Sequence, residues 1–486
     1  MAQHVREVDV IVAGTGPAGM AAVTACARAG VEVAAIEPLD TIGGNAVWST
    51  GYLAFVNSEA QKDAGVSDSI ERYLSDAAHM VELLGDRFGV IWDRELTRLF
   101  AEESSNTYDF LVSHGVRFSR FIPRPRQHTV DRMLAIEDTW MLKRAHEQFF
   151  AMPNVHTFFG HFGERLIMDG GRVVGMRVAP WSARESGEVE AFEIRARKGV
   201  VLACGGYQSN PAMRLRYQPG YVANGPYLGV GTCRGDAHIM GAAVGGDLIN
   251  MTAVPPLVIV SSAFVEDSIA VNRAGQRFTD EAGPYEERVD AVNAQPERWG
   301  HFIFDNETMQ RKPQLAAQMP QECVSAPTLR DLAGVIGCDP DGLEASVAQW
   351  NAFLASGAES DPATGRVIVP EERRQIKQGP FWSSRMVVGI NFVCGGFNTT
   401  LDMQVVNAFG EPIPGLWAAG DAAGGMNVTS DLGGVHIAGG LTLGRIAGQS
   451  AAAGKQSAPK QFKLRGEGLP SMLATRIALV HLPGEK

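Results

Sequence analysis

The sequence lacks three features that would assign it at once to a common class of protein. Its six cysteines are scattered, with no Cys-x-x-Cys pair and no Cys-x-x-Cys-His motif, so we expect no disulfide framework, attached haem or metal site. It has no run of 18 apolar residues and no apolar signal-peptide core, so we expect a soluble cytoplasmic protein without a membrane span. The 43 Lys and Arg do not exceed the 54 Asp and Glu, so a nucleic-acid or anionic-membrane partner is not expected.

The overall composition is that of an ordinary folded protein. Hydrophobic residues make up 45% and charged residues 20% of the 486 positions, which excludes disorder, collagen and coiled coil as descriptions of the whole chain. This length suggests about three domains, or equally one large cofactor domain with an insertion. Glycine is the anomaly, because its 55 residues are clustered and the clusters contain the candidate site.

A glycine-rich loop stands between a predicted strand and a predicted helix near the start of the chain. Residues 8–13 are short, apolar and β-branched, as in a buried parallel strand, and residues 18–29 form an alanine-rich helical segment. In such a loop Gly14 permits the tight turn, Gly16 lets a pyrophosphate approach the backbone, and Gly19 lets the helix pack on the strand.

The residues after this loop complete the pattern of a dinucleotide site. Pro17 and Ala18 begin the helix, whose N-terminus would face the phosphates. Residues 31–36 are a second strand, and Glu37 at its end can accept hydrogen bonds from ribose hydroxyls. Strand, glycines, helix, strand and acid in this register predict a bound dinucleotide.

Further small residues favour FAD over NAD. Backbone amides and small side chains that would continue a phosphate and flavin cradle follow Glu37 at Gly43, Gly44, Asn45, Ser49 and Gly51. Two more predicted strands, residues 200–204 and 416–419, end in Gly205-Gly206 and in Gly420-Asp421. Because a strand's carboxyl end meets the ligand crevice of an α/β sheet, three strands that return to one cofactor suit FAD, with Asp421 on the ribityl chain.

Together these segments resemble the flavoprotein family of soluble fumarate reductases and 3-ketosteroid dehydrogenases. The matching stretches are residues 10–51, 200–206, 235–238, 271–278, 395–396, 414–425 and 443–448. The resemblance implies an α/β fold, with a Rossmann-like FAD-binding domain of the glutathione-reductase type in two parts, 1–248 and 389–454. It also implies an inserted α+β capping domain at 249–388, before a C-terminal tail at 455–486.

The same resemblance implies FAD held without a covalent bond. Asn45-Ala46-Val47-Trp48-Ser49 stands where membrane-bound relatives carry a linking histidine. Additional candidates for contact with FAD are Phe162, Asp236 and Gly433.

Three positions depart from the fumarate reductase pattern, in which cationic side chains grip a dicarboxylate. Asp431 stands in the place of the arginine before Leu-Gly-Gly, Tyr285 in the place of a second arginine, and Asn391 begins the segment where a histidine precedes Gly-Gly. A carboxylate about 4 Å from another carboxylate costs about 4 kcal/mol at an effective dielectric constant of about 20. A C4 dicarboxylate is therefore disfavoured as the substrate, unless Asp431 is protonated or turned away.

The pair Pro284-Tyr285 resembles the ketosteroid dehydrogenase branch instead, where the tyrosine removes a proton beside a ketone. The pKa of a free tyrosine is about 10, so a positive neighbour such as Arg288 would have to lower it. Backbone amides around Gly434 could receive the enolate oxygen. A packed loop tyrosine is the open alternative for Tyr285.

Five residues are weaker candidates. Asp431 is equally well explained as a helix N-cap, and His436 more readily packs beside the flavin than acts as a general acid. Arg124 and Arg126 lie in a basic, proline-stiffened loop and could hold a substrate carboxylate, although a solvated loop explains them too. Asn391 could hydrogen-bond the flavin or the substrate.

The sequence thus predicts an FAD-dependent dehydrogenase that forms a carbon–carbon double bond next to the ketone of a cyclic substrate. Its expected partners are this small molecule and an external electron acceptor, namely oxygen, a quinone or a redox protein, in a monomer or small homo-oligomer. The alternatives are a reductase of an activated double bond, which needs a positioned acid and an electron donor, and a non-catalytic flavin-binding protein.

Overall fold

The structure is a computed structural model of the chain. It describes residues 7–49, 51–124, 127–186, 191–218, 223–227, 229–254, 257–259, 267–311, 322–368, 374–390, 392–429 and 432–460. Among these residues, no helix combines the length and the apolar character needed to cross a membrane.

The larger part of the molecule is built on a mostly parallel sheet with the order β18-β19-β9-β1-β2-β6. Its strands are β1 (Glu7–Ala13), β2 (Val33–Glu37), β6 (Val155–Phe159), β9 (Phe192–Leu202), β18 (Gln404–Val406) and β19 (Pro412–Ala418). The hairpin of β7 (His161–Asp169) and β8 (Arg172–Pro180) joins it through β9. Strands from both ends of the chain thus share one sheet, which confirms the expected α/β class.

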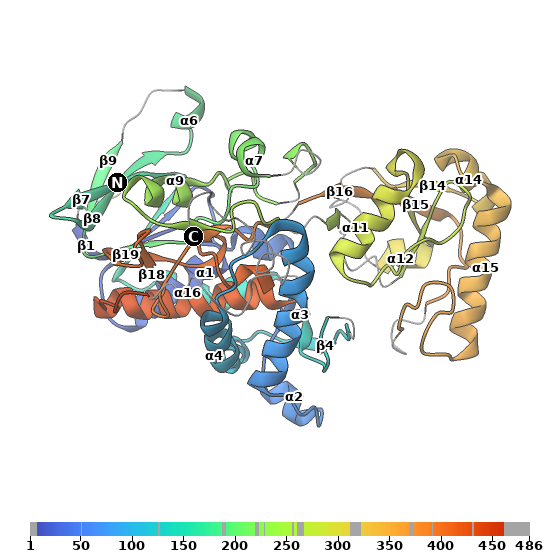
Figure 1. Cartoon of the computed structure of the whole chain (residues 1–486), viewed down its shortest axis with the longest axis horizontal. Coiled ribbons are helices and arrows are strands. Elements are labelled where there is room, and N and C mark those ends of the chain that lie inside the picture. The colour runs from blue at the N-terminus through green and yellow to red at the C-terminus, as the bar shows by residue number, and fades with distance from the viewer. Residues whose placement is uncertain are drawn as a thin grey trace, which may run out of the picture.

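Helices cover this sheet and enclose the main apolar core. α1 (Pro17–Arg28) packs against α5 (Trp140–Phe150) and α16 (Val435–Ala453), although α16 lies at the far end of the sequence (Figure 1). The other helices of this part are α2 (Glu59–Asp63), α3 (Ile70–Phe88), α4 (Arg94–Ser113), α6 (Ala183–Ser186), α7 (Pro211–Tyr217) and α9 (Asp236–Ala243). A small sheet of β3 (Tyr52–Ala54), β5 (Met133–Ile136) and β4 (Phe118–Phe121) lies beside α16.

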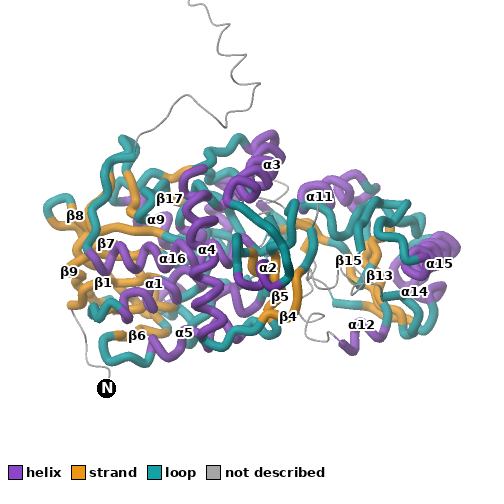
Figure 2. The backbone as a smooth tube through the Cα atoms, turned by 90° about the horizontal axis from the view of Figure 1, so that it is seen from below, coloured by secondary structure: helices purple, strands orange, loops and turns teal. Residues whose placement is uncertain are grey.

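The middle of the chain forms a second body with its own core at one end of the molecule (Figure 2). Its antiparallel sheet has the order β12-β13-β15-β14, from β12 (Ile269–Val271), β13 (His301–Phe304), β15 (Phe381–Arg385) and β14 (Val324–Ala326). Its helices are α11 (Tyr285–Ala294), α12 (Asn306–Arg311), α14 (Leu329–Ile336) and α15 (Pro340–Ser356). We call this body the cap.

Two short antiparallel pairs mark where the chain leaves the larger part and returns to it. β10 (Leu248–Ile249) pairs with β17 (Gly396–Phe397), and β11 (Leu257–Ile259) pairs with β16 (Val387–Gly389). Residue 249 of β10 and residue 388 of β16 are the limits that the resemblance implies for the capping domain, and these limits stay a prediction.

Candidate functional site

In the glycine loop between β1 and α1, two glycines pack closely against the protein backbone and a third faces open space. A Cβ on Gly14 would lie 2.4 Å from the Ala203 carbonyl oxygen, and one on Gly19 would lie 1.9 Å from the Gly14 carbonyl oxygen. A Cβ on Gly16 would meet nothing within 4 Å. Gly16 is also the N-cap of α1, with no side-chain cap. Its lack of a side chain therefore leaves room for a ligand in front of the uncapped amides of the helix, as a pyrophosphate requires.

Glu37 lies at the end of β2 and is tied to this loop. Its Oε2 accepts hydrogen bonds from the backbone N–H (2.9 Å) and the hydroxyl (2.7 Å) of Thr15, and its Oε1 accepts from the N–H of Leu39 (3.0 Å). Burial raises the pKa of Glu37 above its ordinary value, although these hydrogen bonds oppose the shift. Each carboxylate oxygen can accept more than one hydrogen bond, so contact with a ribose hydroxyl stays compatible with this geometry.

The predicted cradle after Glu37 packs on the same loop. The Gly43 N–H donates to the carbonyl of Thr15 (2.9 Å), and a Cβ on Gly44 would lie 2.8 Å from the Cα of Gly16. Ser49 follows the 3-10 helix Gly44–Trp48, and its hydroxyl donates to the carbonyl of Ala46 (2.7 Å) and accepts from the N–H of Gly51 (3.1 Å).

Three strand ends meet beside this loop, as the sequence predicts. In the parallel register Ala13 of β1 and Ala418 of β19 both lie beside Leu202 of β9. Gly14, Gly205-Gly206 and Gly420-Asp421 therefore follow neighbouring strands at one edge of the sheet. One detail differs: β19 ends at Ala418, and Asp421 lies on a short 3-10 helix, residues 420–422.

Asp421 has two side-chain partners that the sequence did not reveal. Its Oδ1 lies 2.5 Å from Nε2 of His436 on α16, and its Oδ2 accepts from Nε2 of Gln208 at 2.9 Å. Burial alone would raise the pKa of Asp421, but these two neighbours outweigh it and hold the pKa below the usual value. The His436 ring also packs against Phe392, with the centroids 4.4 Å apart. His436 thus combines a ring contact with a carboxylate partner.

Asn45 lies in a second polar cluster. Its amide Nδ2 donates to the Tyr227 hydroxyl (3.0 Å), and its Oδ1 accepts from the N–H of Val230 (2.7 Å). The sequence singled out Asn45 and gave no signal for Tyr227, because 182 residues separate them.

Phe162 and Asp236 are linked by an arginine that the sequence did not single out. The Arg184 guanidinium lies 3.8 Å from the centroid of the Phe162 ring and forms a 2.5 Å ion pair with Asp236. These two predicted FAD contacts therefore lie close together.

The backbone at the start of α16 is only partly available to a ligand. The Gly433 N–H donates to Oε1 of Gln127 (3.3 Å), and the Val435 N–H donates to the carbonyl of Leu432 (3.1 Å). The N–H groups of Gly433 and Val435 are thus already engaged within the protein. The Gly434 amide remains the candidate.

Two arginines of the cap with buried side chains, Arg277 and Arg366, form an ion-pair cluster. Glu281 accepts from Arg277 at 2.9 Å and from Arg366 at 3.1 Å, and Arg277 also pairs with Asp361 at 2.5 Å. Arg288 is buried and donates to the backbone carbonyl of Glu281 at 3.2 Å, so its guanidinium is engaged within the cap.

Several predicted site residues lie wholly or partly outside the described part of the structure. Tyr285 is the first residue of α11, but its side chain lies outside the described part of the structure. Arg126, Asn391 and Asp431 also lie outside the described residues. Arg124 is half-buried, and its Nη1 donates to the carbonyl of Pro123 at 2.8 Å.

These features together fit FAD as the bound group. The open space in front of Gly16 has room for the pyrophosphate, and the carboxylate of buried Glu37 can accept a hydrogen bond from a ribose hydroxyl. Asp421 follows the third of the strands that end here, and it contacts His436. The bare amides of α1 are the donors that a diphosphate needs.

Comparison with known proteins agrees with this fit. The family model described as "FAD binding domain" matches residues 9–437. A urocanate reductase of Eggerthella lenta is 28% identical over 477 residues, covering 92% of this chain and 75% of that protein. The open conformation of a flavocytochrome c3 fumarate reductase has a TM-score of 0.72 at 26% identity, covering 92% of this chain and 78% of that one. A 3-ketosteroid-Δ4-(5α)-dehydrogenase from Rhodococcus jostii, solved with 4-androstene-3,17-dione, has a TM-score of 0.66 at 25% identity. The match covers 92% of this chain and 97% of that one.

Proposed function

This chain belongs to the family of FAD-binding flavoproteins that its glycine motifs predict, and on that premise we propose that it is a dehydrogenase of cyclic ketones. As a flavin-dependent oxidoreductase of the fumarate reductase and ketosteroid dehydrogenase family, it binds FAD. The proposed reaction introduces a carbon–carbon double bond next to the carbonyl of a largely apolar ring.

One observation carries this proposal: two arginines of the cap with buried side chains, Arg277 and Arg366, are matched by buried carboxylates of the cap. In the cap, Arg277 and Arg366 face Glu281 and Asp361, so two positive charges meet two negative ones. A dicarboxylate needs unmatched cations, preferably guanidinium forks, to offset its lost hydration. Because Arg277 and Arg366 are already paired within the cap, they supply no unmatched charge for a dicarboxylate. Asp431 at the position of a family arginine adds support for a neutral substrate.

The proposed chemistry divides between Tyr285 and the start of α16. The Tyr285 phenolate takes the proton from the carbon next to the ketone, and the Gly434 amide receives the negative charge that develops on the carbonyl oxygen. Bound FAD supplies the acceptor for the hydride that leaves the neighbouring carbon. The carbon–carbon double bond forms as these two hydrogens depart, and an external acceptor (oxygen, a quinone or a redox protein) takes up the two electrons.

Anaerobic bleaching of the flavin tests this function. Purified holoenzyme is mixed without oxygen with 3-ketosteroids, with substituted cyclohexanones and, separately, with succinate. We expect a ketone to remove the flavin absorbance and succinate to leave it unchanged. Tyr285→Phe should retain FAD and slow bleaching by about 10²- to 10⁴-fold, the usual contribution of a general base. Bleaching by succinate alone, or an unchanged rate in Tyr285→Phe, would refute the substrate or the base, respectively.

A second function, the reduction of an activated carbon–carbon double bond, is favoured by a different observation. His436 lies 2.5 Å from Asp421, and such a pair can hold a proton for delivery to a substrate carbon. The urocanate and fumarate reductases among the relatives also support reduction of a double bond as the direction of the reaction. In this case the chemically reduced enzyme should be reoxidised without oxygen by an unsaturated acid or ketone, and no saturated ketone should bleach the oxidised enzyme.

A further inference from the structure

We propose that Gln127 and His128 are positioning residues that clamp the peptide groups of Gly433 at the start of α16. The Gly433 N–H donates to Oε1 of Gln127 at 3.3 Å, and the Gly433 carbonyl accepts from Nε2 of His128 at 2.9 Å. Two consecutive side chains thus hold the two peptide groups that flank one glycine, more than 300 residues away in the sequence. A Cβ on Gly433 would lie 2.7 Å from the sulfur of Met133, so the glycine fits closely in this clamp.

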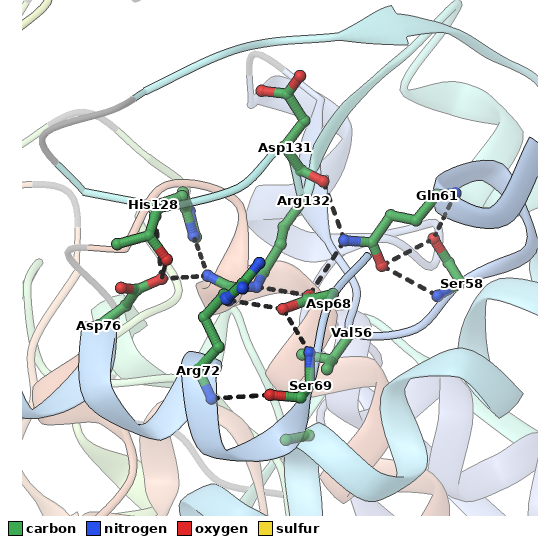
Figure 3. A network of polar contacts seen from close by, with 12 residues as sticks. Val56, Ser58, Gln61, Asp68, Ser69, Arg72, Asp76, His128, Asp131 and Arg132 are labelled. Atoms are coloured by element: carbon green, nitrogen blue, oxygen red, sulfur yellow. Dashed lines mark hydrogen bonds and ion pairs between the residues drawn. The ribbon is translucent and has the colours of Figure 1, made fainter. Parts of the chain in front are cut away.

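A buried arginine sets the proton position on His128. Nη1 of Arg132 lies 3.4 Å from Nδ1 of His128 (Figure 3). A guanidinium can only donate, so Nδ1 acts as the acceptor, and the imidazole proton lies on Nε2, which donates to Gly433. Burial, helped by the charge of Arg132, lowers the pKa of His128 to about 4, so the ring is neutral at neutral pH.

Two carboxylates fix the arginine in turn. Arg132 is fully buried and donates to Asp68 through Nε (2.7 Å) and Nη2 (2.8 Å), and to Asp76 through Nη1. Asp76 also accepts from the N–H (3.0 Å) and the hydroxyl (3.1 Å) of Thr129. A buried ion network adds little net stability but imposes a definite geometry, which is what a positioning device requires.

The clamped glycine is next to the part of the chain that the proposed reaction uses. Gly434 follows it directly, and its own carbonyl accepts from the N–H of Ala54 at 3.0 Å. His436, two residues further, reaches Asp421. With the peptides on both sides of Gly433 fixed, the direction of the Gly434 amide is fixed as well. The expected effect of the clamp on catalysis rests on the proposed function. Its effect on the order of the backbone around Gly433 can be measured without any substrate.

The test compares His128→Phe, which cannot donate to Gly433, with His128→Gln, whose Nε2 can. His146→Gln is the matched control, because His146 is equally buried and its Nδ1 contacts Thr24. Hydrogen–deuterium exchange of the holoenzyme reports the backbone, and anaerobic flavin bleaching reports turnover. We expect faster exchange of residues 432–436 and about 10- to 100-fold slower bleaching in His128→Phe at unchanged FAD content, with both restored by His128→Gln.

The outcomes separate the two proposals. In one outcome, hydrogen–deuterium exchange changes as expected, but no ketone bleaches even the unaltered enzyme. This outcome supports the clamp and refutes the proposed function. Unchanged exchange in His128→Phe refutes the clamp, and equal loss in His128→Gln refutes the role of the hydrogen bond. If His128→Phe does not fold, Gln127→Leu replaces it, and unchanged exchange at Gly433 in that variant also overturns the clamp.

Discussion

The prediction that separates ligand binding from packing most clearly concerns two glycines of the same loop. Alanine at Gly16 adds a methyl group that meets no protein atom within 4 Å, at a φ of −66° that alanine adopts freely. The folded apoprotein should therefore be unchanged or more stable by about 0.4–1 kcal/mol, because alanine restricts the unfolded chain. Alanine at Gly19 adds a methyl group 1.9 Å from the Gly14 carbonyl oxygen, so this variant should fail to fold or melt far lower.

FAD binding should respond in the opposite way. The Gly16→Ala methyl group occupies the space in front of the α1 amides, and the loss of one hydrogen bond to a charged phosphate costs about 1.5–3 kcal/mol. That corresponds to an increase of about 10- to 150-fold in the dissociation constant for FAD. With FAD at 100 times the original dissociation constant, the unaltered protein gains about 2.7 kcal/mol of stability, and a variant weakened 100-fold gains about 0.4 kcal/mol.

Thermal denaturation of the apoproteins, with and without FAD, measures both quantities, and a fluorescence titration gives the dissociation constants. A Gly16→Ala apoprotein that melts well below the unaltered one would refute the assignment of Gly16 to ligand approach. An unchanged affinity for FAD would refute it equally.

Two further predictions concern stability. Burial lowers the pKa values of His128, His146 and His301 to about 4, 3 and 4, against about 6.5 in the unfolded chain, so protonation favours unfolding. The free energy of unfolding of the unaltered protein should therefore be complete above pH 6.5 and fall towards pH 4, with a loss of about 2 kcal/mol for each histidine at pH 5. In denaturant titrations, His146→Phe should make this pH dependence less steep. An identical pH slope in His146→Phe would contradict the reasoning. Glu281→Gln removes a negative charge that two buried arginines share, so it should destabilise the cap by about 3–5 kcal/mol. Limited proteolysis should then cleave the cap earlier, at unchanged FAD content. Unchanged proteolysis would show that the ion-pair cluster does not stabilise the cap.

The sequence determined the cofactor loop almost completely. β1, α1 and β2 begin and end within two residues of the predicted limits, and Glu37 lies where the pattern placed it. The reason is that periodicity, glycine spacing and strand length act within about 30 residues, where the chain has little freedom. The convergence of the strand ends before Gly205 and Gly420 was also predictable, because neighbouring parallel strands bring their carboxyl ends to one edge.

Tertiary structure alone decided which side chains meet. His128 and Gly433 are 305 residues apart, and Gln208 and Asp421 are 213 apart, so no local pattern links them. The spacing suggested Arg288 as a positive neighbour of Tyr285 but gave no sign of the hydrogen bond that its guanidinium donates to the carbonyl of Glu281 inside the cap. A spacing along the chain fixes where a backbone position lies on its own helix or strand, whereas the partner of a buried polar side chain depends on which distant elements pack against it.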